Sequence, residues 1–293
     1  MGEGMVNAEL VKTLRSKTGA PMMHCKKALE ETKGDLESAV DLLRKQGIAT
    51  AAKKAGNLTS DGLVALSRDG NSRVAIVEMN TQTDFVAKNN KFRDFVRQVS
   101  LLALDARDID DLKSSVMPSG STVSDSLVEN IAVIGENITL KRIGKVELSG
   151  DGVISTYVHN KVEDSMGKVA VAVVLESNGD KDKLEELGKQ IAMHIAATNP
   201  KSLDIDSLDK ALIDREKEIF AQQALNSGKP KDIIEKMESG MLKKFFKQVV
   251  LLEQPFIMND KVSISELLKN SANDLKTEIK IQKFIKYEVG ESV

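Results

Sequence analysis

One order of secondary-structure elements occurs twice in this sequence, and the repetition restricts the possible folds more than any other feature. Residues 62–67 and 73–80 are β-prone runs on either side of Asp69-Gly70, a dipeptide typical of hairpin turns. A helix with a clean apolar stripe is predicted from about Lys91. The same order of strand, strand and helix returns later in the chain, which predicts an internal structural duplication.

The second copy begins at Asp151-Gly152, as the first begins at Asp61-Gly62. Alternating and continuous apolar patterns predict strands over residues 151–159 and 168–176, and helical spacing predicts a helix over residues 183–198. Two further strand-like runs, residues 142–148 and 281–289, are available as a third strand for each copy. The repeat is visible in the order of elements rather than in residue identity.

Further helices are predicted at the start of the chain and between residues 207 and 252. Three short helices open the sequence, with Asn7 and Asp35 suited to cap the first and third, and the third is expected to stop near Gly47. Two longer helices between residues 207 and 252 are separated by a turn signal over residues 226–230. A hairpin with arms of roughly 30 Å cannot bury itself well alone, so we expect it to serve self-association or partner contact.

Composition argues against several classes of function. The 42 Lys and Arg residues balance 44 Asp and Glu residues, and a net charge of −2 does not suit a dedicated nucleic-acid binder. The Gly-Lys pairs lack the earlier glycine of a phosphate-binding loop, which argues against nucleotide hydrolysis. No spacing typical of metal ligands occurs. The longest apolar run, residues 169–175, is too short to cross a membrane. The single cysteine, Cys25, cannot form an intrachain disulfide and favours a cytoplasmic setting.

Three rival interpretations stay open on these grounds. The first is an RNA-binding module whose basic patch would comprise Lys26, Lys27, Lys53 and Lys54. The second is a thiol enzyme built on Cys25, although the adjacent His24 would point to a different helix face. The third is a purely structural dimer assembled through the helical hairpin.

One segment between a predicted strand and a predicted helix has an unusual composition. It spans residues 81–90 and reads Thr-Gln-Thr-Asp-Phe-Val-Ala-Lys-Asn-Asn. In one interpretation, Thr83 or Asp84 caps the helix and Phe85 packs inward, as most aromatic side chains do. In the other, Phe85 stands outward as an anchor for a partner, with Asp84 beside it for a polar contact. A protruding aromatic residue among polar neighbours is the usual composition of an interface hot spot, and periodicity alone does not choose between the two.

Several motifs in order along the chain carry a family resemblance. They are Leu10-Val11-Lys12, Thr18-Gly19-Ala20-Pro21-Met22-Met23, Cys25-Lys26-Lys27-Ala28-Leu29, Gln82-Thr83-Asp84-Phe85-Val86-Ala87, Ile134-Gly135-Glu136-Asn137-Ile138, Ile191-Ala192-Met193-His194, Ser227-Gly228-Lys229-Pro230, Gln254-Pro255-Phe256 and Tyr287-Glu288-Val289-Gly290-Glu291. With these motifs the chain resembles the bacterial elongation factor Ts family, the exchange factors of elongation factor Tu. The resemblance covers nearly the whole sequence, and Thr-Asp-Phe-Val is its most specific element.

The resemblance implies an α+β fold. Its parts would be an N-terminal three-helix UBA-like domain, a duplicated α+β core with antiparallel sheets, and an inserted antiparallel helical hairpin. The expected boundaries are residues 1–56 for the helical domain and linker, 57–140 for the first core subdomain, 141–206 with 253–293 for the second, and 207–252 for the hairpin.

The resemblance also implies a function and its residues. A guanine-nucleotide exchange factor binds elongation factor Tu in its GDP-bound and nucleotide-free states, displaces Mg²⁺ and promotes GDP release, without catalysing a reaction or carrying a cofactor or metal. The residues implied to act on the Mg²⁺ site are Thr83, Asp84, Phe85 and Val86. Further contacts implied with the partner are Leu14, Met22, Met23 and His159. His24 departs from the family, which commonly has Asp there.

Overall fold

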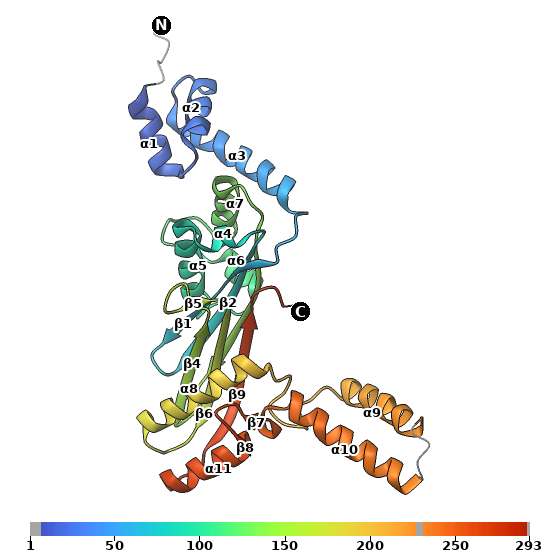
Figure 1. Cartoon of the computed structure of the whole chain (residues 1–293). Helices are drawn as coiled ribbons and strands as arrows, with labels where there is room; N and C mark the ends of the chain where they lie inside the picture. The colour runs from blue at the N-terminus through green and yellow to red at the C-terminus, as the bar shows by residue number, and fades with distance from the viewer. Residues whose placement is uncertain (1–6, 227–230, 292–293) are drawn as a thin grey trace.

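The structure is a computed structural model, and it describes residues 7–226 and 231–291. Two antiparallel sheets lie face to face at the centre, and helices cover the outer face of each sheet. Three N-terminal helices stand at one end of this core and two long helices project from the other end (Figure 1). The three N-terminal helices and the two projecting helices therefore lie at opposite ends of the sheets.

The N-terminal helical unit consists of three helices around a small aliphatic core. The helices are α1 (Ala8–Thr18), α2 (Met22–Glu31) and α3 (Leu36–Lys54). Asn7 caps α1 and Asp35 caps α3, each by accepting a backbone N–H three residues later. Gly19 ends α1 with a φ of 64°, a left-handed conformation that glycine adopts without a Cβ clash.

Helix α3 does not stop near Gly47, so that prediction is wrong. The helix continues to Lys54, and Gly47 is buried inside it against helix α7 (Val123–Ile134). A Cβ added at Gly47 would lie 3.4 Å from Cβ of Ala132, so the missing side chain lets the two helices approach closely. Glycine lowers helix propensity by about 1 kcal/mol, and packing on α7 outweighs that loss here.

The first sheet has the strand order β3-β2-β1-β5, and all its pairings are antiparallel. Its strands are β1 (Asp61–Asp69), β2 (Arg73–Thr81), β3 (Ile138–Glu147) and the two-residue β5 (Met166–Gly167). Strand β5 comes from the loop between two strands of the other sheet and pairs with the edge of β1. Four helices follow on one side: α4 (Asp84–Ala87), α5 (Asn90–Leu102), α6 (Ile109–Ser114) and α7.

The second sheet has the order β4-β6-β9, the same arrangement of first, second and third strand as in the first sheet. Its strands are β4 (Gly152–His159), β6 (Val169–Glu176) and β9 (Lys280–Glu288). Helices α8 (Lys181–Thr198) and α11 (Ile264–Leu275) cover its outer face, and a short hairpin, β7 (Pro255–Phe256) with β8 (Asn259–Ser263), precedes α11. The predicted third strands are therefore present in both sheets.

Alternate residues of the central strands serve two different cores. In β6, Val171 and Val173 pack against the helices, whereas Ala170 and Ala172 pack against the first sheet. Successive side chains of a strand point to opposite faces, so a strand buried on both faces reads as the continuous apolar run seen at residues 169–175. The core therefore has three layers of side chains. One lies between the first sheet and its helices, one between the two sheets, and one between the second sheet and its helices.

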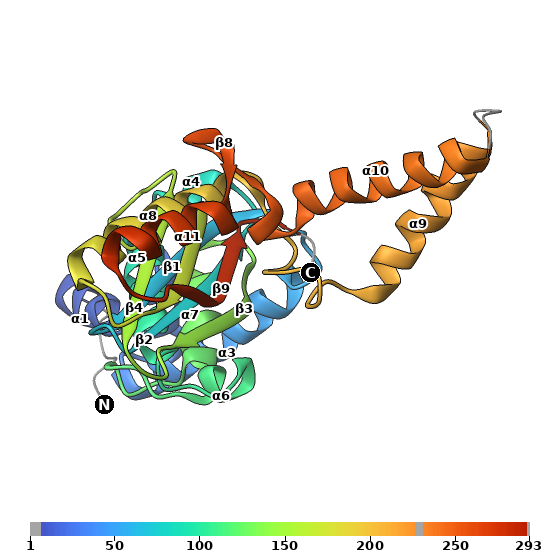
Figure 2. The ribbon, with the colours of Figure 1, turned by 90° about the horizontal axis from the view of Figure 1, so that it is seen from below.

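Helices α9 (Lys210–Leu225) and α10 (Lys231–Val249) pack against each other and project from the core (Figure 2). The aromatic side chains Phe220, Phe245 and Phe246 meet near the base of this pair. The turn predicted over residues 226–230 lies outside the described residues from position 227 onward. The two arms expose Ile219 and Ile233 along their length.

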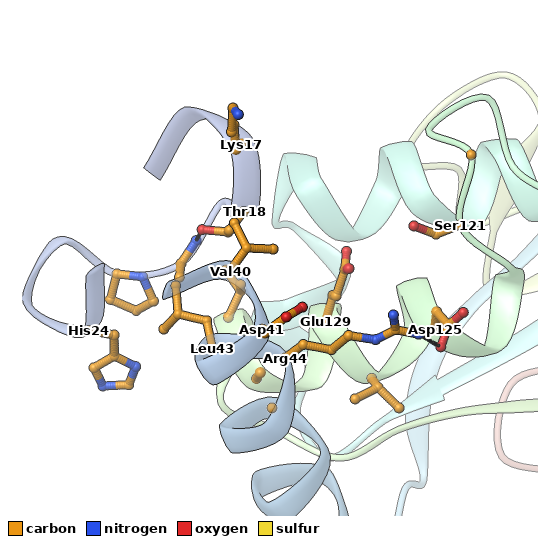
Figure 3. A pocket seen from close by; sticks show the side chains of 17 residues that line it. Lys17, Thr18, His24, Val40, Asp41, Leu43, Arg44, Ser121, Asp125 and Glu129 are labelled. Atoms are coloured by element: carbon orange, nitrogen blue, oxygen red, sulfur yellow. Dashed lines mark hydrogen bonds and ion pairs between the residues drawn. The ribbon is translucent and has the colours of Figure 1, made fainter. Parts of the chain in front are cut away.

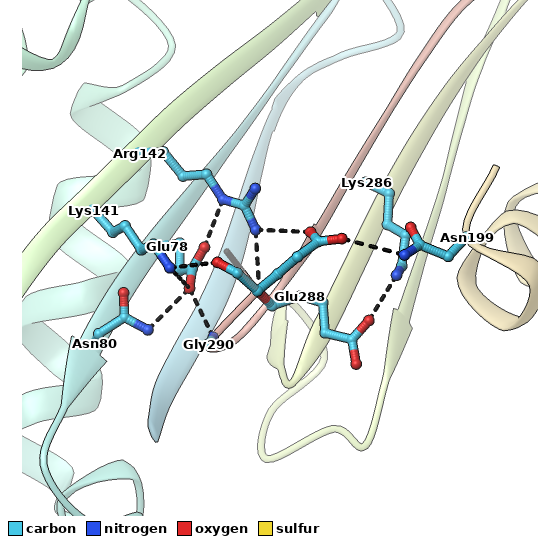
Figure 4. A network of polar contacts seen from close by, with 9 residues as sticks. Glu78, Asn80, Lys141, Arg142, Asn199, Lys286, Glu288 and Gly290 are labelled. Carbon is cyan, nitrogen blue, oxygen red and sulfur yellow. Dashed lines mark hydrogen bonds and ion pairs between the residues drawn. The ribbon is translucent and has the colours of Figure 1, made fainter. Parts of the chain in front are cut away.

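A buried carboxylate joins strand β2 to the C-terminal segment (Figure 4). Glu78 has no exposed surface; Arg142 Nε donates to its Oε2 at 2.6 Å, and the N–H of Gly290 donates to its Oε1 at 3.0 Å. Arg142 also binds Glu291 at 3.2 Å. Buried charges are tolerated when they are paired and fully hydrogen-bonded. This network fixes Gly290 and Glu291 on the first sheet, beside strand β2.

Candidate protein-interaction site

Phe85 stands on the surface in the segment that follows strand β2. Its side chain is 75% exposed, while the next two residues, Val86 and Ala87, are buried in the helix-covered core of the first sheet. The interpretation in which Phe85 packs inward is therefore wrong. Helix α5 is capped by Asn89, whose Oδ1 accepts the N–H of Lys91 at 2.9 Å, and not by Thr83 or Asp84.

Polar groups surround the exposed ring. Asp84 binds Lys88 at 3.0 Å, one helical turn away, and the Lys88 ammonium lies 5.6 Å from the centroid of the Phe85 ring. A cation at that distance is attracted to the ring face, although an exposed ion pair adds little to stability. Lys88 was not among the residues predicted for the site; the i,i+4 spacing of Asp84 and Lys88 is the signal that could have indicated it.

Thr83 is held from outside its own segment by Glu136, in the turn between α7 and β3. The N–H of Thr83 donates to Glu136 Oε2 at 3.0 Å, and its hydroxyl donates to Oε1 at 2.7 Å. The Thr81 hydroxyl in turn donates to the carbonyl oxygen of Thr83 at 2.9 Å. This contact with Glu136 was not predicted, because no local pattern connects two positions this far apart in the sequence.

The predicted contacts in the N-terminal helical unit differ in their exposure. Met22 and Met23, in the first turn of α2, are 56% and 60% exposed. Leu14 is completely buried in the core of the unit, so it presents no surface to a partner and supports the unit by packing. Cys25 is buried in the same core, with its thiol 3.5 Å from the carbonyl oxygen of Ala20. A buried thiol is a packing residue, which counts against a thiol enzyme.

His159 ends strand β4 and is exposed. Its Nδ1 lies 3.1 Å from the hydroxyl of Tyr157, and the two rings are 6.1 Å apart. This pair lies on the edge strand of the second sheet. The described contacts of His159 are with Tyr157 and do not include the Phe85 segment.

Two further apolar side chains are exposed where the sequence predicted no contact. Ile257 and Met258 form the turn between β7 and β8 and are 46% and 52% exposed. Adjacent large apolar residues in a tight turn, next to Asn259-Asp260, are the signal that could have indicated them. Exposed apolar pairs of this kind mark contact surfaces more often than isolated side chains do.

A cavity of 340 Å³ lies where the N-terminal helical unit meets α7 (Figure 3). Lys17 and Arg44 line it together with Asp41, Asp125 and Glu129, and Arg44 binds Asp125 at 2.9 Å. Hydrogen bonds from Thr122 and Arg44 lower the pKa of Asp125. Because acidic and basic groups are both present, the cavity lacks the positive field that a nucleotide phosphate requires, and we interpret it as the joint between two packed units.

The described part of the chain has neither a metal-binding cluster nor a membrane-spanning helix. In residues 7–226 and 231–291, no cluster of three or more His, Cys, Asp or Glu side chains is arranged to hold a metal ion. Over the same residues, no helix combines the length and the apolar composition that crossing a bilayer requires.

Comparison with known proteins places the chain in a family. The family model described as elongation factor TS matches residues 82–291. The chain is 51% identical over 294 residues to elongation factor Ts of Rickettsia felis and of Rickettsia prowazekii (strain Madrid E), and 49% identical to that of Rickettsia bellii. Each alignment covers 100% of this chain and 94% of the relative. The chain therefore belongs to the elongation factor Ts family.

Proposed function

We propose that this chain is the guanine-nucleotide exchange factor of elongation factor Tu in translation elongation. It binds the GDP complex of that protein in the cytoplasm, displaces Mg²⁺ and promotes GDP release so that GTP can bind, and it catalyses no bond chemistry. Membership of the family supports the choice of partner. The single observation that carries the mechanism is the Phe85 ring, 75% exposed on a segment that is anchored on both sides.

The proposed mechanism is an intrusion into the partner's Mg²⁺ site. Mg²⁺ bridges phosphate oxygens to protein ligands with strict octahedral geometry, so a small displacement of those ligands removes a large electrostatic attraction for GDP. An aromatic ring has the size to displace them, and Asp84 beside it offers a carboxylate for a polar contact with the partner. Thr83 and Val86 act by holding this pair outward, since Val86 is buried and Thr83 is bound to Glu136.

The distortion of the partner must be offset by contacts elsewhere. Met22 and Met23 are the proposed contacts from the N-terminal helical unit, and His159, Ile257 and Met258 are those from the second sheet and its hairpin. By thermodynamic linkage, the factor by which this chain weakens GDP binding equals the factor by which GDP weakens binding of this chain. The nucleotide-free partner is therefore bound more tightly than its GDP complex.

Substitution of Phe85 tests the mechanism directly. Phe85→Ala should reduce the coupling between the two ligands by about 2 kcal/mol or more, as buried aromatic anchors do at interfaces, which corresponds to roughly 30-fold slower GDP release at a saturating concentration of this chain. Stopped-flow release of a fluorescent GDP analogue from elongation factor Tu measures the rate. Leu58→Ala, which removes an even more exposed apolar side chain outside the site, is the control. Full acceleration by a folded Phe85→Ala protein would refute the mechanism.

A further inference from the structure

Helix α4, which carries Phe85, is too short to hold the ring in place by its own hydrogen bonds. It has four residues, whereas isolated helices need about 12–15 residues even to be marginally stable. Its outward presentation of Phe85 must come from tertiary contacts at the two ends of the segment. On the C-terminal side, Val86 and Ala87 are buried and supply one of these anchors. The other lies on the N-terminal side, at Thr83.

Thr83 occupies the N-cap position of α4, yet its side chain makes no capping hydrogen bond. A threonine hydroxyl there normally accepts a backbone N–H of the helix. Here the hydroxyl and the N–H of Thr83 both donate to one carboxylate, that of Glu136, at 2.7 and 3.0 Å. Hydrogen bonds to an ionised acceptor are about twice as strong as neutral ones, so this pair dominates the N-terminal anchor. We call it the Glu136 clamp.

The turn that carries Glu136 is itself fixed. Gly135 ends α7 with a φ of 84°, and its N–H donates to the carbonyl of Ile131 at 2.9 Å. On the other side, the side chain of Asn137 donates to the carbonyl of Asn57 at 2.8 Å, in the connection between the N-terminal helical unit and β1. Glu136 therefore extends from a backbone held by a helix end and by a second chain segment, which is what a positioning group requires.

From these contacts we infer that Glu136 is a positioning residue for nucleotide exchange: its carboxylate sets the direction in which Phe85 leaves the surface. The inference rests on the exchange function proposed above, because it explains how the ring is presented to the partner. Glu136 itself need not touch the partner. Loss of the clamp leaves the fold intact, because Val86, Ala87 and the strands stay packed, and it lets the N-terminal half of the segment move.

The first experiment measures presentation in the free protein. The chain contains no Trp, so Phe85→Trp introduces a single indole at the site. With Glu136 intact, we expect high fluorescence anisotropy for that indole. Adding Glu136→Ala should lower the anisotropy, while adding Glu147→Gln, which changes an exposed carboxylate at the far end of the strand that follows Glu136, should not. Circular dichroism and urea unfolding check that each variant is folded. Equal anisotropy with and without Glu136 would overturn the inference without reference to any partner.

The second experiment measures exchange as a thermodynamic cycle. Maximal GDP release should fall about 10-fold in Glu136→Ala, as expected for the loss of charge-assisted hydrogen bonds, and less in Glu136→Gln, whose amide oxygen still accepts one of them. Thr83→Ser, which keeps both donors, should release GDP faster than Thr83→Val, which lacks the hydroxyl donor. Because Thr83→Val already removes the hydroxyl hydrogen bond of the clamp, adding Glu136→Ala should reduce the rate of GDP release by a smaller factor in that background than in the wild type.

The outcomes separate this inference from the function on which it rests. If Phe85→Ala slows exchange and Glu136→Ala does not, or if the Thr83 and Glu136 effects simply add, the positioning role is overturned and the exchange function stands. If Phe85→Ala itself leaves exchange unchanged while the anisotropy result holds, the mechanism by intrusion fails and the clamp remains a structural fact of the segment.

Discussion

At the scale of single residues, the buried imidazole of His194 shows how hydrogen bonding fixes a protonation state. Its Nδ1 lies 3.3 Å from the backbone N–H of Ile257, so Nδ1 must accept. The proton is therefore on Nε2, which donates to Gln254 Oε1 at 2.9 Å. Burial lowers the pKa of His194, and the hydrogen bond with Gln254 opposes that shift in part. The neutral ring also holds the turn that exposes Ile257 and Met258.

The lowered pKa of His194 predicts a pH dependence of stability. Above the ordinary histidine pKa of about 6.5, the ring is neutral in the folded and unfolded chains, and its contribution is fully present. As the pH falls from there through the lowered pKa, the unfolded chain binds the proton first, so stability is lost. Urea unfolding at pH 7.5 and 5.5 should show a larger loss for the wild type than for His194→Gln. An equal loss in both proteins would show that His194 does not titrate in this way.

Gly62 and Gly152 reveal the duplication at the level of one atom. A Cβ at Gly62 would collide with the carbonyl oxygen of Met79, and a Cβ at Gly152 would collide with that of Leu175. Each glycine is near the start of the first strand of its copy, and each carbonyl belongs to the central strand opposite. The two copies therefore share a backbone approach that few other residues permit, although little else in their sequences matches.

Substitution of either glycine should destabilise the fold to a similar extent. Gly62→Ala and Gly152→Ala should each destabilise the protein by more than about 2 kcal/mol, because the added methyl group meets backbone rather than a movable side chain. Gly56→Ala, where a Cβ meets nothing within 4 Å, is the matched control. Urea denaturation midpoints provide the measurement. A neutral effect at Gly62 or at Gly152 would contradict the shared geometry.

At the scale of elements, the regular parts of the fold follow from periodicity and the exceptions follow from tertiary contact. The paired strands and their following helices were predictable because the hairpin turn, the alternation and the apolar stripes are local signals. The end of α3 was not, because Gly47 reads as a helix terminus and its packing against α7 leaves no mark in the sequence around it. Strand β5 was missed for a similar reason, since two residues carry no periodicity.

The same distinction applies to the site. Local sequence placed Thr83, Asp84 and Phe85 between a strand and a helix, but it could not decide which way the ring points. That direction depends on the burial of Val86 and on Glu136, which is distant in sequence and belongs to another turn. The family resemblance identified this segment, whereas the contacts that fix its conformation could be read only from the three-dimensional structure.

At the scale of the whole molecule, the projecting pair of helices α9 and α10 is suited to contact a second copy. The second half of α10 carries Lys243, Lys244 and Lys247 and no acidic residue, whereas its first half carries Glu235 and Glu238 together with Lys236. Antiparallel packing of α10 on α10 would place acidic groups opposite basic ones, and the exposed Gly240 near the middle would allow a close approach. We propose a homodimer formed through this surface.

Sedimentation equilibrium across a range of protein concentrations tests the dimer. The wild type should approach twice the monomer mass, and Ile233→Glu, which places a charge on an exposed apolar position of α10, should shift the equilibrium toward the monomer. Ile48→Glu, at a comparably exposed position on α3, should leave it unchanged. A wild-type chain that stays monomeric at high concentration would leave the hairpin as a surface for other partners.

The small strand β5 has a consequence for solubility. The loop that carries it pairs with β1 at Val64 and Ala65, and the N–H of Leu66 donates to the carbonyl of Ser165 at 2.9 Å. An open edge beside this apolar strand would be a template for strands of other molecules. Strand β5, which comes from the loop between β4 and β6, occupies this edge and leaves it unavailable for intermolecular strand pairing. A longer or more mobile loop should therefore promote aggregation before it affects nucleotide exchange.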